Sequence, residues 1–277
     1  MKPGIYHDLS NEEYHSQTAI NASFLKSWIM KSPLHAVNAK GSIGQTIADI
    51  GTAIHSEALE PDLENVVRSD EKSRATRAFK EHYELCKARG KVLLPAKDYG
   101  NVKGAVHGLV KDDGEVVGGL MNDGHCGKLL KQDDKICEAS IFVTHPDTGL
   151  LLKARPDIFS PTLGVMGDVK SAQDASPRGF GKAIFKLGYH YQAAHYLMCA
   201  RLIGWDVKHW GFLAVEKEPP YPAHFHTLGE EALEHSARVV EAALHEIAEA
   251  KETGNPGTRW GSYTVHHLPE YITNNEE

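Results

Sequence analysis

The chain has 277 residues, of which 41% are hydrophobic, and its formal net charge at pH 7 is −7. That length and apolar content are enough for one elaborated α/β domain with a sizeable core. The acidic balance argues against a protein that coats nucleic acid through a broad basic surface, but a nucleic-acid enzyme with a local basic groove remains compatible with it.

The four cysteines are scattered and form no C-x-x-C pair, so the sequence points neither to a disulfide framework nor to a zinc or iron–sulfur cluster. No apolar run approaches the length that spans a bilayer, and the N-terminus lacks the apolar stretch of a signal peptide. We therefore expect a cytoplasmic protein with buried free thiols and no contact with a membrane.

Residues 1–130 are predicted to be mainly helical. Apolar residues at helical spacing, or charges that alternate along an exposed face, mark four segments. The predicted helices cover residues 19–31, 44–59, 70–90 and 95–109. The first has a capping signal at Asn21 and ends before Ser32, which is followed by proline. Loop-like composition follows around residues 112–114 and 122–124.

Residues 131–260 are predicted to hold a mixed sheet with helices packed on it, and residues 261–277 a polar tail. The predicted strands cover residues 137–145, 150–160, 164–171, 207–216 and 223–228. A long helix is expected after the third strand, from Pro177 or Gly181 to Ile203, and a closing helix over 229–251. The fold class is therefore α/β, with a mixed central β-sheet flanked by helices, in a single domain over residues 1–277.

Two short motifs in neighbouring predicted strands carry most of the chemical information. Arg155-Pro156-Asp157 lies in the second strand, where the proline indicates a sheet edge or a bulge beside a site. Gly167-Asp168-Val169-Lys170 lies in the third. A hairpin that brings Asp157 opposite Asp168 gives two hard oxygen donors for magnesium or manganese.

The alternation of side chains along a strand assigns roles within the second motif. Asp168 and Lys170 share one face, whereas Val169 points into the core and its carbonyl stays free as a further oxygen ligand. Lys170 would position a water or hydroxide, or neutralise charge that develops on a phosphate. The alternative is that these acids belong to a solvated surface hairpin.

Other residues extend the candidate site, each with a simpler alternative. Glu138 offers a third carboxylate or is an exposed strand-end acid, and His55 is a metal ligand or a core histidine in an apolar helix. Gln192 and Tyr196 stand four apart on one helix face, where they support the site or belong to the core. The side chains predicted to contact DNA, or otherwise to form a solvated face, are Ser23, Lys26, Ser32 and Arg155.

In this order along the chain, His55 (in Gly51-Thr52-Ala53-Ile54-His55), Glu138, R-P-D, G-D-V-K and the Gln192/Tyr196 pair resemble the PD-(D/E)XK (restriction-endonuclease-like) nuclease superfamily. The chain most resembles the RecE-type exonucleases (exonuclease VIII), which are related to lambda exonuclease and the RecB nuclease domain. The likeness covers about residues 1–260, including the opening YHDLSNEEYHS and the segment SFLKSWIMKSPLHA. The second acid is Asp168, where many members of the superfamily have glutamate.

The resemblance implies a function and a set of roles. Mg²⁺, with Mn²⁺ as a substitute, would be held by His55, Glu138, Asp157, Asp168 and the Val169 carbonyl. Lys170 would orient the attacking water, and Gln192 and Tyr196 would support the site. The implied activity is 5′→3′ digestion of linear double-stranded DNA from its ends, leaving 3′ single strands for an annealing protein. A ring-shaped homo-oligomer, a trimer or tetramer, is also implied.

Two alternatives stay open at this point. Another nuclease of the superfamily, such as an endonuclease or a single-strand-specific enzyme, would carry the same catalytic residues. A non-catalytic DNA-binding or assembly protein with a decayed site is the other alternative. Against decay stands the complete set of acid, acid and lysine.

Overall fold

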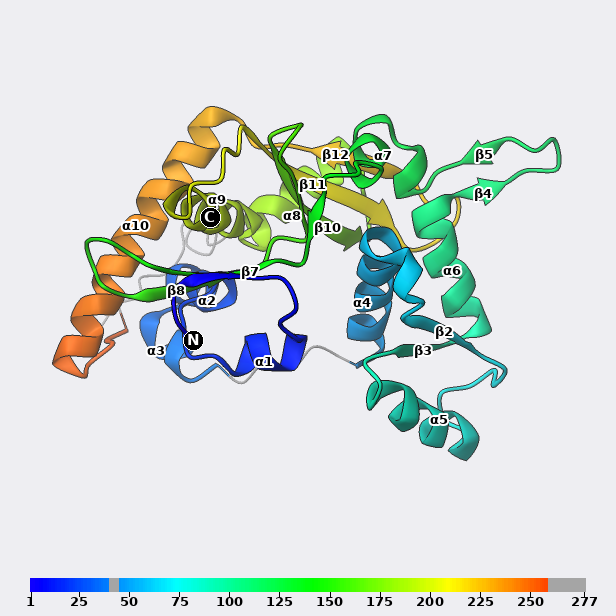
Figure 1. Ribbon diagram of the computed structural model, residues 1–277, viewed down its shortest axis with the longest axis horizontal. Helices are drawn as coiled ribbons and strands as arrows, with labels where there is room; N and C mark the ends of the chain where they lie inside the picture. The colour runs from blue at the N-terminus through cyan, green and yellow to red at the C-terminus, as the bar shows by residue number, and fades with distance from the viewer. Residues whose placement is uncertain (40–44, 259–277) are drawn as a thin grey trace, which may run out of the picture.

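The structure is a computed structural model that describes residues 1–39 and 45–258 (Figure 1). The predicted tail, residues 261–277, and Gly44 at the start of the second predicted helix lie outside the described residues. Within the described ranges, no helix combines the length and the apolar character that crossing a bilayer requires.

A mixed sheet forms the centre of the molecule, as the sequence predicts. In the described residues it has five strands in the order β12-β11-β10-β9-β6, and only the β10–β11 pair is parallel. Their bounds are β6 Ile136–Cys137, β9 Ile158–Ser160, β10 Val165–Ala172, β11 His209–Glu216 and β12 Ala223–His226. The parallel pair needs a crossover between its strands, and two helices, α8 (Pro177–Lys186) and α9 (Tyr189–Leu202), supply it.

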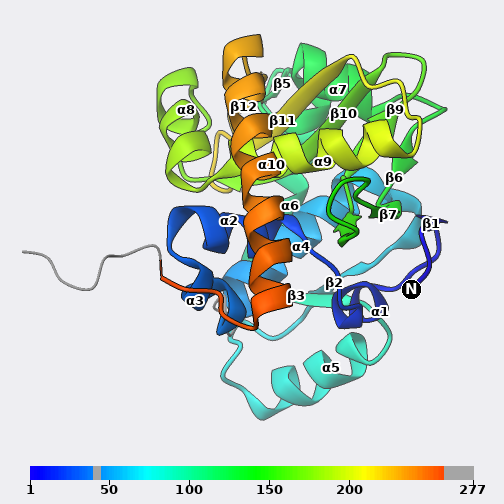
Figure 2. The same cartoon turned by 90° about the vertical axis from the view of Figure 1, so that its left-hand side faces the viewer.

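Helices cover both faces of this sheet because β11 is apolar on both sides. Phe212 and Ala214 pack on one face, and Leu213 and Val215 on the other, all fully buried. The first face is covered by α2 (Ala22–Met30), α8, α9 and α10 (Glu230–Thr253). The second is covered by α4 (Gln45–Leu59), α6 (Ala96–His107) and α7 (Gly124–Leu130). Figure 2 shows α9 and α10 crossing in front of the sheet.

A second, smaller sheet lies beside the first and is built from the N-terminal strand and a hairpin. β7 (Ser140–Thr144) pairs antiparallel with both β1 (Gly4–Tyr6) and β8 (Leu151–Ala154). The short helices α1 (Asn11–Ser16) and α3 (Pro33–Val37) follow β1 and α2 in the chain. Asn21 caps α2 by accepting from the Phe24 amide, as its sequence predicts.

The remaining elements lie at the periphery on the side of α4 and α6. A two-stranded parallel sheet carries α5 against it, and a hairpin of two short strands projects from the body (Figure 1). Their bounds are η1 Pro61–Leu63, β2 Val66–Ser69, α5 Arg77–Lys87, β3 Val92–Pro95, β4 Leu109–Val110, β5 Val116–Val117 and η2 Leu120–Asn122. The projecting hairpin and α7 were not predicted from the sequence.

Three predicted elements are wrong in their continuity. The strand predicted over 150–160 is two strands, β8 and β9, which belong to different sheets, and the strand over 137–145 is likewise divided into β6 and β7. The long helix is divided into α8 and α9 at Gly188, whose φ is +67°. A side chain there would also crowd Met30, so glycine suits this break. Of the helix predicted over residues 70–90, only Arg77–Lys87 is helical in the structure.

Candidate metal centre

The acidic residues of the two motifs lie opposite each other, Asp157 where the chain passes between the two sheets and Asp168 within β10. In the β9–β10 pair Ile158 is opposite Gly167, and the next residues along each strand are Asp157 and Asp168. The hairpin therefore brings the two acids together as the sequence predicts. Both are buried, with 6% and 2% of their surface exposed. Burying two carboxylates side by side is costly unless a cation compensates them.

Three side chains from separate elements converge as a set of candidate metal ligands. His55 comes from α4, Glu138 follows β6, and Asp157 precedes β9. Their ligand atoms all lie within 4.8 Å of one another, and His55 Nδ1 is 3.2 Å from Asp157 Oδ2. An imidazole nitrogen with two carboxylates is a donor set that a divalent metal accepts.

The backbone of Glu138 is strained in a way that serves this convergence. Its φ is +52°, an unusual conformation for a residue with a side chain, and its amide donates to the Asp157 carbonyl over 3.2 Å. The strain ends β6 and sends the chain into the second sheet, leaving Glu138 at the junction beside Asp157. The sequence contains no local signal for this conformation.

Asp157 is held in place by the neighbouring strand. The Val169 amide donates a hydrogen bond of 2.6 Å to Asp157 Oδ2. The Val169 side chain is fully buried in the core, as the alternation of the strand predicts. The predicted use of its carbonyl as a metal ligand stays a prediction.

The second acid forms a network with the lysine and the glutamine. Lys170 Nζ pairs with Asp168 Oδ2, and Gln192 Nε2 donates to Asp168 Oδ1 over 2.8 Å. Lys170 Nζ also donates to Gln192 Oε1 over 3.4 Å. Tyr196, one turn further along α9, is 9% exposed and packs edge-on to Trp210. The structure thus brings together two groups of predicted residues: the three candidate ligands, and this network.

The pKa values of the buried acids agree with a site for a divalent cation. Burial raises the pKa of Glu138 to about 8, and the charge of Asp157 adds to the shift. Burial and the charge of Asp168 likewise raise the pKa of Asp157 to about 6. Arg155 beside Glu138 and Lys170 beside Asp157 offset these increases only in part, and a divalent cation would supply the remaining positive charge. For Lys170, burial lowers the pKa, but Asp168 and Asp157 outweigh it and raise the pKa overall, so the ammonium stays charged.

Two of the residues predicted to contact DNA lie on the side of α2 near this network. Lys26 Nζ lies 5.4 Å from the centre of the Tyr189 ring, and Lys170 Nζ lies 4.7 Å from it. Burial and the charge of Lys170 lower the pKa of Lys26. Ser23 is exposed on the preceding turn. Tyr189 was not predicted as a site residue, although it stands three residues before Gln192 on the same helix.

The other two residues predicted to contact DNA have internal roles instead. Ser32 is fully buried and caps α3, where its hydroxyl accepts from the His35 amide. Arg155 is 9% exposed, and its guanidinium donates to Ser140, Asn11 and the Leu9 carbonyl and packs over the Tyr14 ring at 4.4 Å. We therefore correct both assignments. Neither burial is visible in the sequence, because it depends on distant segments.

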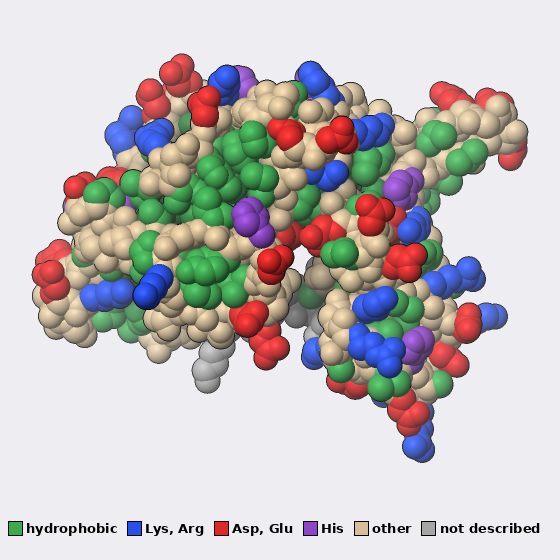
Figure 3. All heavy atoms as spheres, in the orientation of Figure 1, with side chains coloured by type: hydrophobic (Ala, Val, Ile, Leu, Met, Phe, Trp, Pro, Cys, Tyr) green, Lys and Arg blue, Asp and Glu red, His purple; other side chains and the backbone are tan. Residues whose placement is uncertain are grey.

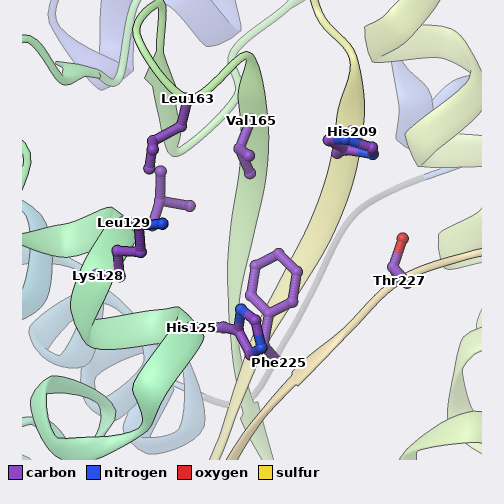
Figure 4. A pocket seen from close by; sticks show the side chains of 8 residues that line it. All are labelled: His125, Lys128, Leu129, Leu163, Val165, His209, Phe225 and Thr227. Atoms are coloured by element: carbon purple, nitrogen blue, oxygen red, sulfur yellow. The ribbon is translucent and has the colours of Figure 1, made fainter.

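Figure 3 shows a hollow between the part that carries α1 and the part that carries α4, with acidic side chains gathered on its walls. A separate cavity of about 290 Å³ lies between α7 and the ends of β10, β11 and β12 (Figure 4). Its lining residues are His125, Lys128, Leu129, Leu163, Val165, His209, Phe225 and Thr227. It shares no residue with the candidate metal centre.

Residues 21–263 match a protein family described as a PDDEXK-like domain of unknown function (DUF3799). The chain belongs to this family. The predicted fold class, a mixed sheet flanked by helices, is thereby confirmed.

A solved structure from Eubacterium rectale, described as a "Putative exonuclease", is similar to the PDDEXK-like domain over almost its whole length. The TM-score is 0.58, the sequence identity is 13%, and the match covers 97% of this chain and 98% of the other. Similarity at this level of identity concerns the fold. No curated protein matches the chain.

Proposed function

We propose that the chain is a divalent-metal-dependent exodeoxyribonuclease of the RecE type, which digests linear double-stranded DNA 5′→3′ and leaves 3′ single strands. The observation that carries the proposal is the position of the ligand set His55, Glu138 and Asp157 beside the Asp168–Lys170–Gln192 network. Membership of a PDDEXK-like family and the description of the Eubacterium rectale neighbour support a nuclease. Polarity, product and Mg²⁺ as the metal rest on the resemblance in sequence.

Each part of the site has a task in hydrolysis of a phosphodiester. A bound divalent cation would supply positive charge against the phosphate and a lowered pKa for an attacking water. The charged Lys170 ammonium donates hydrogen bonds to a phosphate oxygen or to that water. Gln192 orients Lys170 by accepting a hydrogen bond from its Nζ, and it orients Asp168 by donating from Nε2. Val169 fixes the carboxylate of Asp157 through its amide.

The approach of DNA is proposed from the side of α2. Lys26 places a second ammonium near Lys170, and the two flank the same Tyr189 ring. Two cations beside one ring suit a phosphate backbone rather than a neutral substrate. A chain with a net charge of −7 would keep hold of DNA best by enclosing it, which agrees with a proposed ring-shaped trimer or tetramer. An annealing protein is the proposed partner for the 3′ strand.

The test is digestion of linear duplex DNA that carries a label on the 5′ or the 3′ end, in Mg²⁺ and in Mn²⁺. Closed circular duplex, single-stranded DNA and the Asp168→Ala variant serve as comparisons. We expect early release of the 5′ label as mononucleotides, an intact circle and an inactive variant.

Each alternative function gives a different result. Cutting of the closed circle would indicate an endonuclease, and digestion of single strands alone would indicate a single-strand-specific enzyme. Binding of DNA without nucleotide release in either metal would indicate a non-catalytic DNA-binding protein. Any of these results would contradict the proposed exonuclease activity.

A further inference from the structure

A second group of metal-ligand side chains lies far from the candidate metal centre, where the turn between β7 and β8 meets α10. Asp147 from the turn and Glu241 and His245 from the helix offer ligand atoms that all lie within 4.8 Å of one another. Figure 1 shows this turn reaching α10 at the edge of the molecule. Because Glu241 and His245 are four residues apart, they share one face of the helix.

A buried histidine is aimed at the same place. His145 is 3% exposed, and its Nε2 lies 3.2 Å from Glu241 Oε1, while His245 Nε2 lies 3.5 Å from the same oxygen. The other ring nitrogen, His145 Nδ1, is 3.1 Å from Thr148 Oγ1. The contact with Thr148 fixes the ring, so the buried His145 holds the Glu241 carboxylate beside the other two side chains, as a supporting residue does for a metal ligand.

The turn itself is firmly built. The amide of His145 donates to the Leu150 carbonyl over 2.9 Å, and the Gly149 amide donates back to the His145 carbonyl over 3.0 Å. Gly149 adopts a φ of +67°, which closes the turn, and Pro146 restricts the backbone between His145 and Asp147. The turn therefore presents His145 and Asp147 in a fixed relation to the helix.

The group also has unbalanced charge. Asp147 and Glu241 contribute two carboxylates, and within residues 1–39 and 45–258 neither forms an ion pair with a lysine or arginine. A divalent cation would balance the two carboxylates.

We propose that Asp147, Glu241 and His245 form a second cation site, which takes a transition metal of the Zn²⁺ type, and that the buried His145 holds Glu241 in place. One imidazole nitrogen and two carboxylate oxygens are a donor set that Zn²⁺ accepts, whereas Mg²⁺ prefers oxygen ligands and bound water. The ion would link the turn to α10.

The position of the site gives the ion a defined effect. β7 begins two residues after Glu138, and β8 ends three residues before Asp157. The hairpin therefore has these two candidate ligands at its base. The strands span roughly 15–20 Å from that base to the turn. An ion at the turn fastens the tip of the hairpin to α10 without contact with the substrate.

The experiment uses untagged full-length protein that has been stripped of metal with a chelator. Zn²⁺ binding is measured by titration calorimetry, and Co²⁺ is added separately to read its visible absorption, which is intense for a four-coordinate site. Asp157→Asn serves as the background, so that binding at the candidate metal centre is weakened. We expect one equivalent of Zn²⁺ in this background.

Variants of the helix ligands locate the bound ion. His245→Ala and Glu241→Gln are each expected to weaken Zn²⁺ affinity by about tenfold or more and to abolish the Co²⁺ spectrum. His235→Ala, an exposed histidine on the same helix, is the matched control and should bind as the background does.

Two results would overturn the proposal: no Zn²⁺ binding in the Asp157→Asn background, or binding that neither helix variant changes. If Asp157→Asn does not fold, the same comparison is made in the wild type, where His245→Ala must lower the number of bound Zn²⁺ ions by one. An unchanged number there would equally overturn the site. None of these readouts depends on whether the chain digests DNA.

Discussion

The side-chain amide of Gln192 donates to Asp168 Oδ1 over 2.8 Å, and its carbonyl oxygen lies 3.4 Å from Lys170 Nζ. One amide group on α9 therefore contacts both the acid and the lysine of β10. An amide is suited to this task because it carries a donor and an acceptor at once. The helix that crosses the sheet thus sets the orientation of two side chains on a strand.

Replacement of Gln192 tests this relationship. Gln192→Ala removes both contacts while the acid and the lysine remain, so we expect nuclease activity to fall by roughly 10–100-fold. Gln192→Glu should be worse, because it places a carboxylate against Asp168. The rate of nucleotide release from linear duplex measures both, with circular dichroism to confirm folding. Activity of the glutamate variant at or above that of the alanine variant would contradict the assigned role.

The acid and the lysine themselves are tested by Asp168→Ala and Lys170→Ala. Asp168→Ala removes a predicted metal ligand, and Lys170→Ala removes the ammonium proposed to act on the phosphate or the water, so we expect a loss of activity of at least ~100-fold with the fold retained. Lys186→Ala, an exposed lysine in the last turn of α8, is the matched control and should keep full activity. Undiminished digestion by both site variants in Mg²⁺ would remove this network from the active site.

Arg155→Ala should act on stability rather than on DNA binding. The guanidinium joins Ser140, Asn11 and the Leu9 carbonyl, so its loss removes a partner of the fully buried Ser140 and the link from there to the N-terminal segment. We expect the free energy of unfolding to fall by about 2–4 kcal/mol, measured by urea denaturation. Lys26→Ala should show the reverse pattern, with weaker DNA binding and a smaller change in stability. An Arg155 variant of unchanged stability would refute the internal role.

The two raised carboxyl pKa values predict how stability depends on pH without metal. The pKa of Glu138 is raised to about 8 and that of Asp157 to about 6, both above their values in an unfolded chain. Between about pH 4 and pH 8 the folded state therefore binds more protons than the unfolded state. The contribution of these two acids to the free energy of unfolding should consequently fall as the pH rises through this window.

The measurement compares the wild type with Glu138→Gln in the presence of a chelator. The variant should gain melting temperature over the wild type as the pH rises from 5 to 8, because glutamine carries no charge to bury. Excess Mg²⁺ should remove most of that advantage, since the ion stabilises the two carboxylates. A difference that stays constant with pH would show that the pair is not destabilised by its charge.

Much of the sheet was predictable because its signals are local. The alternation of Asp168, Val169 and Lys170 sets their faces correctly, and the two apolar faces of β11 follow from a continuous hydrophobic run. The breaks were not predictable in the same way. β8 ends at Ala154 because β7 pairs with it only that far, a contact that no window of sequence contains.

In the candidate site, too, some features were predictable from local sequence and others were not. Pro156 signalled an irregularity beside Asp157, and the sequence located the candidate ligands and the network in their order. The positive φ of Glu138 had no signal, because glutamate is neither glycine nor asparagine. The burial of Ser32 and Arg155 was missed because a serine cap and an arginine in a strand read as surface until their partners are known.

The chain passes between the two sheets at Glu138 and again at Asp157. These two residues therefore connect the sheets and are also candidate metal ligands. A change in the angle between the sheets would alter the separation of the two carboxylates directly. Affinity for the ion and rigidity of the junction are therefore linked, so the ion would bind most tightly in the arrangement of sheets that it also stabilises. A change that makes the junction between the sheets less rigid would therefore also release the metal.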